Sequence, residues 1–307
     1  MLSIDGLHKR AALFRCIRSF FYKQGFLEVD TPIRQPVYIP ESNIVPISSE
    51  GQYLQTSPEL CMKRLLAAGC DRIFQFSHCF RKGELGRLHL EEFQLLEWYR
   101  SGCDYTQLMV DCQALLRILC EELTENSTCN GDSANTEVFS GINLTAEWQR
   151  LTVAEAFATH SPISLEEALT TGNFDEILTE YVEPHLGMEA PVFLYAYPYQ
   201  LASLARKSPF NPTIAERFEL YIQGIELANG FSELTDEDEQ RKRFENEIAA
   251  IDCNIGRTAC MPERFLQDLV KLEEAAGIAL GVDRLFMLAL NKKNITSAVT
   301  FAPEDFL

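Results

Sequence analysis

The sequence lacks several features that would assign a chain to a particular class. No apolar run is long enough to span a bilayer, and the first ten residues, MLSIDGLHKR, lack the basic and apolar regions of a signal peptide. The ten cysteines include no CxxC pair and the five histidines are dispersed, which disfavours a disulfide framework and a zinc site. We therefore expect a cytoplasmic protein with reduced thiols and no membrane partner.

Positive charge is also scarce. The chain has 27 Lys and Arg residues against 45 Asp and Glu residues, a net charge of −18. A broad nucleic-acid surface needs clustered basic residues, so tRNA is not an expected partner. Such a field attracts a cationic ligand or a basic partner, whereas an anionic ligand must be bound by local arginines.

What is present is a globular chain with both helical and strand patterns. Helical periodicity over residues 3–24 and 104–124, and a mixed stretch over 150–190, predict helices around strands that come in pairs. This arrangement predicts an α+β fold with a mostly antiparallel sheet flanked by helices. We expect one domain over residues 1–307, with a surface insertion at about 124–150, where TENSTCNGDSANTE is rich in turn formers.

The segment FRKGELGRLHLEEFQLLEWYR carries the first candidate site. It predicts two strands separated by a polar loop. Alternate side chains of a strand share a face, so Phe93, Leu95, Glu97 and Tyr99 are expected to lie together. A carboxylate and a phenol beside an aromatic ring indicate a binding site. A solvated glutamate on an edge strand is the alternative that the pattern leaves open.

The segment YIQGIEL predicts a two-residue hairpin turn at Gln223-Gly224, which pairs Tyr221 with Glu226. Glu219 then shares a face with Glu226 as a diagonal neighbour on the paired strand. Two carboxylates so placed repel each other unless a cation bridges them. Oxygen ligands suit Mg²⁺, with phosphates completing its shell. The alternative is that both acids point into water.

The segment GIALGVDRLF predicts a strand broken by glycines that runs into an apolar helix. Gly277 and Gly281 would allow a ligand to approach the backbone closely. Arg284 stands in an apolar context and needs an anionic partner, which is either a ligand or an acid of the core. No GK[ST] follows the glycines, so this is not a P-loop.

These segments, in this order, resemble the three signature motifs of class II aminoacyl-tRNA synthetases. GFLEVDTPI is similar to the dimer-interface motif, FRKGELGRLHLEEF to the strand–loop–strand motif, and GIALGVDRL to the glycine-rich strand and helix. GIELANGFSELTD resembles the lysyl branch. The resemblance spans nearly the whole chain and implies the class II catalytic fold and a homodimer.

Departures from the lysyl branch distinguish its relatives. Lysyl-tRNA synthetases carry an N-terminal anticodon-binding barrel, which is not expected here because the first predicted helix starts within a few residues of Met1. Ser57 in TSPE replaces alanine, and Ala279 replaces glycine. With LEWYR and GIELANGF, these residues resemble the elongation factor P–(R)-β-lysine ligase family. That resemblance implies an ATP- and Mg²⁺-dependent ligase that forms AMP and pyrophosphate. It would activate (R)-β-lysine, or lysine, as an adenylate and transfer it to a lysine of translation elongation factor P.

The resemblance also implies residue roles. Arg81 would contact the ATP α-phosphate and the substrate carboxylate, and Arg284 the γ-phosphate, as the two catalytic residues. Phe93 would stack on adenine, and Glu219 and Glu226 would hold Mg²⁺. The remaining expected ATP-binding residues are Lys82, Gly83, Glu84, His89, Leu220 and Gly281.

For the amino acid, Glu59 would meet the amino group near the carboxylate, while Glu97, Tyr99 and Glu233 would hold the far ammonium. The other expected substrate-binding residues are Ser57, Pro58, Glu226, Asn229, Phe231 and Ala279. A diamine with one carboxylate requires acids at both ends and an arginine at one, which this set supplies.

Two positions depart from the family pattern. The second motif usually reads Arg-X-Glu, but here the third position is Gly83 and Glu84 follows one residue later; Leu90 replaces the asparagine that commonly follows His89. Two other functions stay open. One is a lysyl-tRNA synthetase paralogue without the barrel that makes adenylate or acts on tRNA. The other is a catalytically silent regulator that binds an amino acid.

Overall fold

A computed structural model describes residues 1–129, 138–253 and 258–306 of the protein. The strands are β1 (Leu27–Glu28), β2 (Arg34–Gln35), β3 (Ser48–Ser49), β4 (Gln52–Leu54), β5 (Arg72–Phe80), β6 (Glu92–Ser101), β7 (Gln149–Thr152), β8 (Val192–Tyr195), β9 (Arg217–Ile222), β10 (Ile225–Ser232) and β11 (Ala275–Gly281). The α-helices are α1 (Ile4–Lys23), α2 (Glu59–Ala67), α3 (Tyr105–Cys129), α4 (Val153–His160), α5 (Leu165–Thr171), α6 (Phe174–Ile177), α7 (Glu237–Cys253), α8 (Glu263–Leu269) and α9 (Val282–Ala289).

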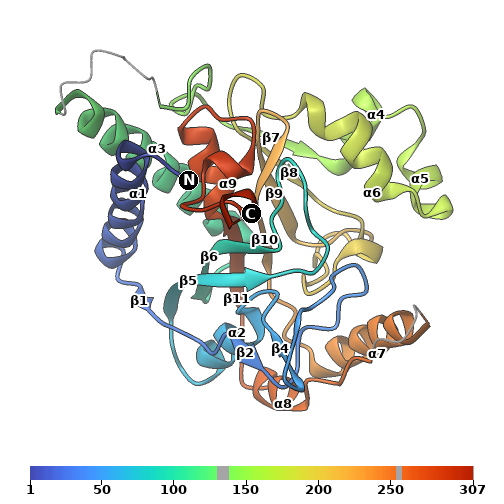
Figure 1. Cartoon of the computed structure of the whole chain (residues 1–307). Coiled ribbons are helices and arrows are strands. Elements are labelled where there is room, and N and C mark those ends of the chain that lie inside the picture. The colour runs from blue at the N-terminus through green and yellow to red at the C-terminus, as the bar shows by residue number, and fades with distance from the viewer. Residues whose placement is uncertain (130–137, 254–257, 307) are drawn as a thin grey trace.

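A large sheet forms the centre of the molecule (Figure 1). Its strand order is β1-β5-β6-β11-β10-β9-β8-β7, and a small sheet, β2-β4-β3, lies beside it. Within the large sheet, β1 pairs with β5 and β7 pairs with β8 in parallel, and the other neighbours are antiparallel. The predicted α+β fold with a mostly antiparallel sheet is therefore confirmed.

One face of this sheet is apolar. Leu96 and Trp98 of β6, Ile278 and Leu280 of β11, and Phe218 of β9 are buried in one cluster with α1, α3 and α9. Removal of this apolar area from water is the main stabilising contribution to such a layer. Because side chains alternate along a strand, the residues between these five point to the opposite face, where the polar side chains gather.

Two groups of helices cover parts of the opposite face. Helices α2, α7 and α8 share a second core cluster with Ile73 and Tyr99, at the bottom of Figure 1. Helices α4 to α6 share a third cluster with Val192 and Leu194 of β8, at the upper right of Figure 1. The helical, peripheral character predicted for residues 150–190 is thereby confirmed.

Two further predictions concern the first helix and the surface insertion. The first helix is confirmed, and the Ser3 side chain accepts a hydrogen bond from the Gly6 backbone at its start. The predicted insertion can be followed only in part: α3 runs on to Cys129, and residues 130–137 lie outside the described ranges. None of the helices in the described part of the chain has the length and apolarity that a bilayer crossing requires.

Candidate active site

The register of four central strands builds the floor of a cavity. Glu97 of β6 pairs with Ala279 of β11, Ala279 pairs with Asn229 of β10, and Asn229 pairs with Glu219 of β9. Side chains directly opposite one another share a face, so this row crosses the face opposite the apolar core. A cavity of about 580 Å³ lies over the row, within the size range of small-molecule sites.

The β9–β10 hairpin forms one wall of this cavity. The predicted two-residue turn is confirmed, because Gln223 and Gly224 both have positive φ and Tyr221 pairs with Glu226. Positive φ at both central residues gives the turn type whose twist matches that of the flanking strands.

A β-bulge follows the turn and changes the alternation of β10. The register shifts between Glu226 and Ala228, so Glu219 lies opposite Asn229, one residue further along β10 than in a regular hairpin. Glu219 and Glu226 nevertheless both line the cavity. Because a bulge places two residues opposite one, Leu227 and Ala228 both enter the core cluster. Glu226 and Asn229, three residues apart, therefore both line the cavity.

Glu97 lies in the middle of the sheet. Its strand is flanked by β5 and β11, and the residue is 1% exposed, so a solvated glutamate on an edge strand is excluded. Ser57 Oγ donates to its Oε1 at 2.6 Å, and the Tyr99 hydroxyl donates to its Oε2 at 2.7 Å. Burial, helped by the charge of Glu59, raises the pKa of Glu97 to about 7. A cation in the cavity would favour its ionised form.

A glycine allows this arrangement. A Cβ on Gly277 would lie 2.2 Å from the Tyr99 ring and 2.4 Å from Glu233 Oε1, far inside contact distance. The absence of a side chain at Gly277 therefore leaves room for the Tyr99 and Glu233 side chains to lie directly against the backbone of β11.

A buried lysine that the sequence analysis missed lies at the same end of the cavity. Lys63 Nζ is 2.5 Å from Glu59 Oε1 and 2.5 Å from Glu233 Oε2. Glu233, expected to hold the substrate ammonium, is therefore paired with Lys63 and does not line the cavity. The available signal was that Lys63 follows Glu59 by four residues, which places both on one helix face. We call Ser57, Glu59, Lys63, Glu97, Tyr99 and Glu233 the buried end.

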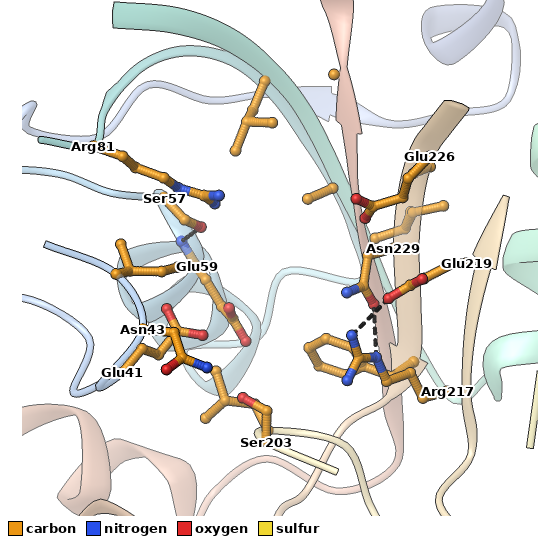
Figure 2. A pocket seen from close by; sticks show the side chains of 18 of the residues that line it. Glu41, Asn43, Ser57, Glu59, Arg81, Ser203, Arg217, Glu219, Glu226 and Asn229 are labelled. Carbon is orange, nitrogen blue, oxygen red and sulfur yellow. Dashed lines mark hydrogen bonds and ion pairs between the residues drawn. The ribbon is translucent and has the colours of Figure 1, made fainter. Parts of the chain in front are cut away.

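The facing wall holds the predicted metal ligands (Figure 2). Glu219 is buried, so the alternative that it points into water is excluded. It accepts hydrogen bonds from Tyr197 at 2.5 Å, Tyr221 at 2.7 Å and Arg217 at 2.7 Å. Burial and the nearby charge of Glu226 raise the pKa of Glu219. Arg217 was also missed, although it precedes Glu219 by two residues and so shares its face.

The polar loop between β5 and β6 forms a more exposed part of the site. The Arg81 guanidinium lies 5.1 Å from the centre of the Phe93 ring and 3.9 Å from Glu84. Glu84 lines the cavity, whereas Gly83 is exposed and outside it. The acid that follows the motif arginine by three residues therefore faces the site.

Arg284, near the start of α9, extends toward the same region. It donates to the Glu226 backbone oxygen at 2.7 Å, lies 3.4 Å from Glu226 Oε2, and lies 2.6 Å from His89 Nε2. Burial and the Arg284 charge lower the pKa of His89. Arg284 thus contacts an acid of the cavity and not one of the apolar core. We call Arg81, Glu84, His89, Phe93, Glu226 and Arg284 the open end.

Most of the predicted site residues meet at this cavity. Those that line it are Ser57, Glu59, Arg81, Glu84, His89, Phe93, Glu97, Tyr99, Glu219, Glu226, Asn229, Phe231, Ala279, Gly281 and Arg284. Outside the lining, Lys82 and Gly83 are exposed on the loop, Pro58 caps α2, Leu220 is buried in the core, and Glu233 is buried against Lys63. Glu41, Asn43 and Ser203, which no motif indicated, also line the cavity (Figure 2).

The lining is strongly acidic. Its carboxylates are Glu41, Glu59, Glu84, Glu97, Asp175, Glu219, Glu226, Glu247 and Asp283, and its arginines are Arg81, Arg217 and Arg284. An excess of acids around a few arginines suits a ligand that carries several positive groups beside an anionic one.

Comparison with known proteins agrees with this geometry. The family model described as tRNA synthetases class II (D, K and N) matches residues 4–305. The chain belongs to this family. Three relatives of the synthetase, from Salmonella arizonae, Salmonella gallinarum and Proteus mirabilis, are named elongation factor P–(R)-β-lysine ligase. Each is 39% identical over 97% of this chain and 95% of its own length. The chain is thus an enzyme of the ligase type.

Glu219 and Glu226 are the two carboxylates that would hold a divalent cation. They lie on one wall of the cavity and repel each other, but Arg217 already pairs with Glu219 Oε1 at 2.7 Å, so the cation would share Glu219 with Arg217. Among the residues that the structure describes, no three His, Cys, Asp or Glu side chains gather around a metal position. A Mg²⁺ ion here would therefore take its remaining ligands from phosphates and water.

Proposed function

We propose that this synthetase activates (R)-β-lysine, or lysine, with ATP as an adenylate and transfers it to a lysine side chain of translation elongation factor P. The observation that carries the proposal is Glu97, a buried carboxylate aimed into the cavity and held only by the neutral donors Ser57 and Tyr99. Such a group favours a cationic ligand, which would stabilise its ionised form. The names of the three relatives support the acceptor protein and the amino acid.

The open end is proposed to bind ATP. Phe93 would stack on adenine, with Arg81 at the α-phosphate and Arg284 at the γ-phosphate, and both arginines are partly exposed to the cavity. Glu219 and Glu226 would hold Mg²⁺, which neutralises phosphate charge when bound. A Cβ on Gly281 would make only ordinary contacts within the protein, the nearest at 3.7 Å from Arg284, so the fold itself does not require glycine there. We attribute this glycine to the close approach of the nucleotide to the backbone.

In the first proposed step, an oxygen of the substrate carboxylate attacks the α-phosphorus and pyrophosphate leaves. Arg81 stabilises the negative charge that develops there, by electrostatics and positioning. Glu97 and Tyr99 orient the far ammonium. In the second step the uncharged acceptor amine attacks the activated carbonyl carbon and a C–N bond forms. The bond to the phosphate oxygen breaks, AMP leaves, and the amine nitrogen releases one proton to solvent.

A homodimer built around α1 and β1 is part of the proposal. Tyr22, Leu27 and Ile33 are large apolar residues exposed in this region, and exposed apolar patches mark interfaces. Sedimentation velocity of the full chain tests it; a monomer at all concentrations would contradict this part.

Pyrophosphate exchange tests the proposed activity. Exchange is measured with (R)-β-lysine, with L-lysine and without amino acid, followed by transfer to elongation factor P. We expect exchange with (R)-β-lysine above that with L-lysine, and a covalent adduct on the acceptor protein. No exchange with either amino acid would overturn the proposal. Exchange without transfer would favour the paralogue that makes only adenylate.

A further inference from the structure

The buried end contains a cation of its own. Lys63 is 1% exposed, and its ammonium contacts Glu59 and Glu233, both at 2.5 Å. It also lies 5.2 Å from the centre of the Phe231 ring, which lines the cavity. A buried ammonium is stable only where its charge is balanced, so Lys63 and the two carboxylates form one charged unit.

The acids of the buried end outnumber its cation. Glu59 and Glu233 share Lys63, while Glu97 receives hydrogen bonds only from the neutral Ser57 and Tyr99 hydroxyls. When all three carboxylates are ionised, as a bound cationic ligand favours, they and the ammonium give a net charge of −2. Within the described part of the chain, neither Glu233 oxygen has a hydrogen-bond donor besides this ion pair.

We propose that Lys63 sets the charge of the buried end at −2, so that this end selects an amino acid with two ammonium groups over one with a single ammonium. The inference rests on the proposed function, because it takes lysine or β-lysine as the ligand. Lys63 would act through Glu59 and Glu233, which makes it a positioning residue.

The protonation behaviour of these groups agrees with this role. Burial would lower the pKa of Lys63, but Glu233 and Glu59 outweigh it and raise that pKa, so the side chain stays an ammonium. Burial raises the pKa of Glu233 to about 8 against the effect of Lys63. Glu97, Tyr99 and Glu41 are further titratable groups that act on this unit. A cationic ligand would draw the remaining protons off its carboxylates.

A series of charge variants tests the inference. Lys63→Met removes the charge at similar length, Glu233→Gln removes one carboxylate, and the double variant restores −2 without the ion pair. Calorimetry gives the Kd values of L-lysine, (R)-β-lysine and L-norleucine, which has the lysine carbon chain without the far ammonium. We expect Glu233→Gln to lower the preference for lysine over norleucine roughly tenfold, and the double variant to regain most of it.

The outcomes separate this inference from the proposed function. A wild-type protein that does not prefer lysine over norleucine would overturn both. A wild-type preference with a double variant no better than Glu233→Gln would overturn the role of Lys63 alone, because the effects of the two substitutions would then not compensate.

Thermal melts of the ligand-free variants at several pH values test the same inference where a variant is too unstable for calorimetry. With Lys63→Met we expect a melting temperature that falls more steeply than that of the wild type from about pH 6 to pH 9, because Glu97 and Glu233, whose pKa values are raised to about 7 and about 8, then ionise without a cation beside them. Adding Glu233→Gln should reduce this slope. A double variant that melts below the Lys63→Met protein at the upper pH would show that Lys63 acts by packing, and would overturn the inference.

Discussion

The two ends of the cavity differ in how their side chains are held. At the buried end, Lys63 and Glu233 have exposed side-chain fractions of 1% and 0%, and short bonds tie each group to a neighbour. At the open end, Glu84 and Glu226 are 31% and 37% exposed, and the distances between their carboxylates and the arginines are longer than 3 Å. The first end is pre-organised around charge, whereas the second has groups that can rearrange around a ligand.

This difference assigns separate tasks to the two ends. A rigid set of buried groups discriminates by the cost of leaving one group unpaired. Partly exposed arginines contribute most when a ligand excludes water around them. Substitutions at the open end should therefore reduce catalysis with little effect on stability, and substitutions at the buried end should change substrate choice and the pH dependence of stability.

The largest effect is expected for Arg81→Gln. Because the contacts of Arg81 are a 3.9 Å approach to Glu84, a 3.4 Å hydrogen bond to the Thr56 oxygen and a 5.1 Å approach to the Phe93 ring, its loss should change the melting temperature little. Pyrophosphate exchange should fall roughly 10²- to 10³-fold. Arg87→Gln, on the same loop but outside the cavity lining, is the matched control. Exchange close to the wild-type rate would remove Arg81 from the proposed chemistry.

Glu97→Gln tests the opposite end. The amide keeps the shape of the side chain but removes the charge that would pair with the far ammonium, so the KM for the amino acid should rise roughly 100-fold. The KM for ATP should change little, and the free energy of unfolding should not fall, because a buried charge is removed. Glu92→Gln on the same strand, where the side chain is 63% exposed, is the control. An unchanged amino-acid KM would contradict the assignment.

Ala279→Gly tests substrate choice at the row of side chains that lies under the cavity. The Ala279 methyl group lies in the row between Glu97 and Asn229, where it would limit the room for an α-amino acid. Its removal should shift the ratio of kcat/KM values toward L-lysine by about tenfold. Steady-state kinetics with both lysine isomers measures this ratio. If the ratio does not move, Ala279 has no part in specificity.

The smallest effect is on stability as a function of pH. With the pKa of Glu97 raised from 4.5 to about 7, the folded protein binds more protons than the unfolded chain between these values. The ligand-free protein should therefore lose stability as pH rises through this window. The increase in melting temperature that lysine causes should grow over the same pH window. Each kcal/mol of added unfolding free energy corresponds to roughly 2–4 °C. Thermal melts with and without lysine measure it, and Glu97→Gln should flatten the difference.

Regular elements of the site could be predicted from the sequence. Strand β6 pairs without interruption with both neighbours, so simple alternation placed Glu97 and Tyr99 on one face. The Gln223-Gly224 turn was equally readable, since its type depends on two residues. The bulge after Glu226 was not, because Leu227 and Ala228 are both apolar and either can face a core.

Other parts of the site depend on contacts between distant segments. A lysine on a helix that also carries Glu59 and Arg64 is typical of a surface residue, and nothing near Lys63 in the sequence indicates that Glu233 lies beside it. The resemblance to a family carried Glu233 into the prediction as a substrate ligand, but it did not indicate the ion pair.

The bulge in β10 also determines what could be transplanted into another protein. A designer who copied this wall onto a regular hairpin would preserve each residue and lose the surface, because Asn229 and Phe231 would turn inward and Ala228 would face the ligand. The unit to be grafted is the run from Glu226 to Phe231 with its irregular pairing to β9. The β-bulge is therefore required for the arrangement of side chains on this binding surface.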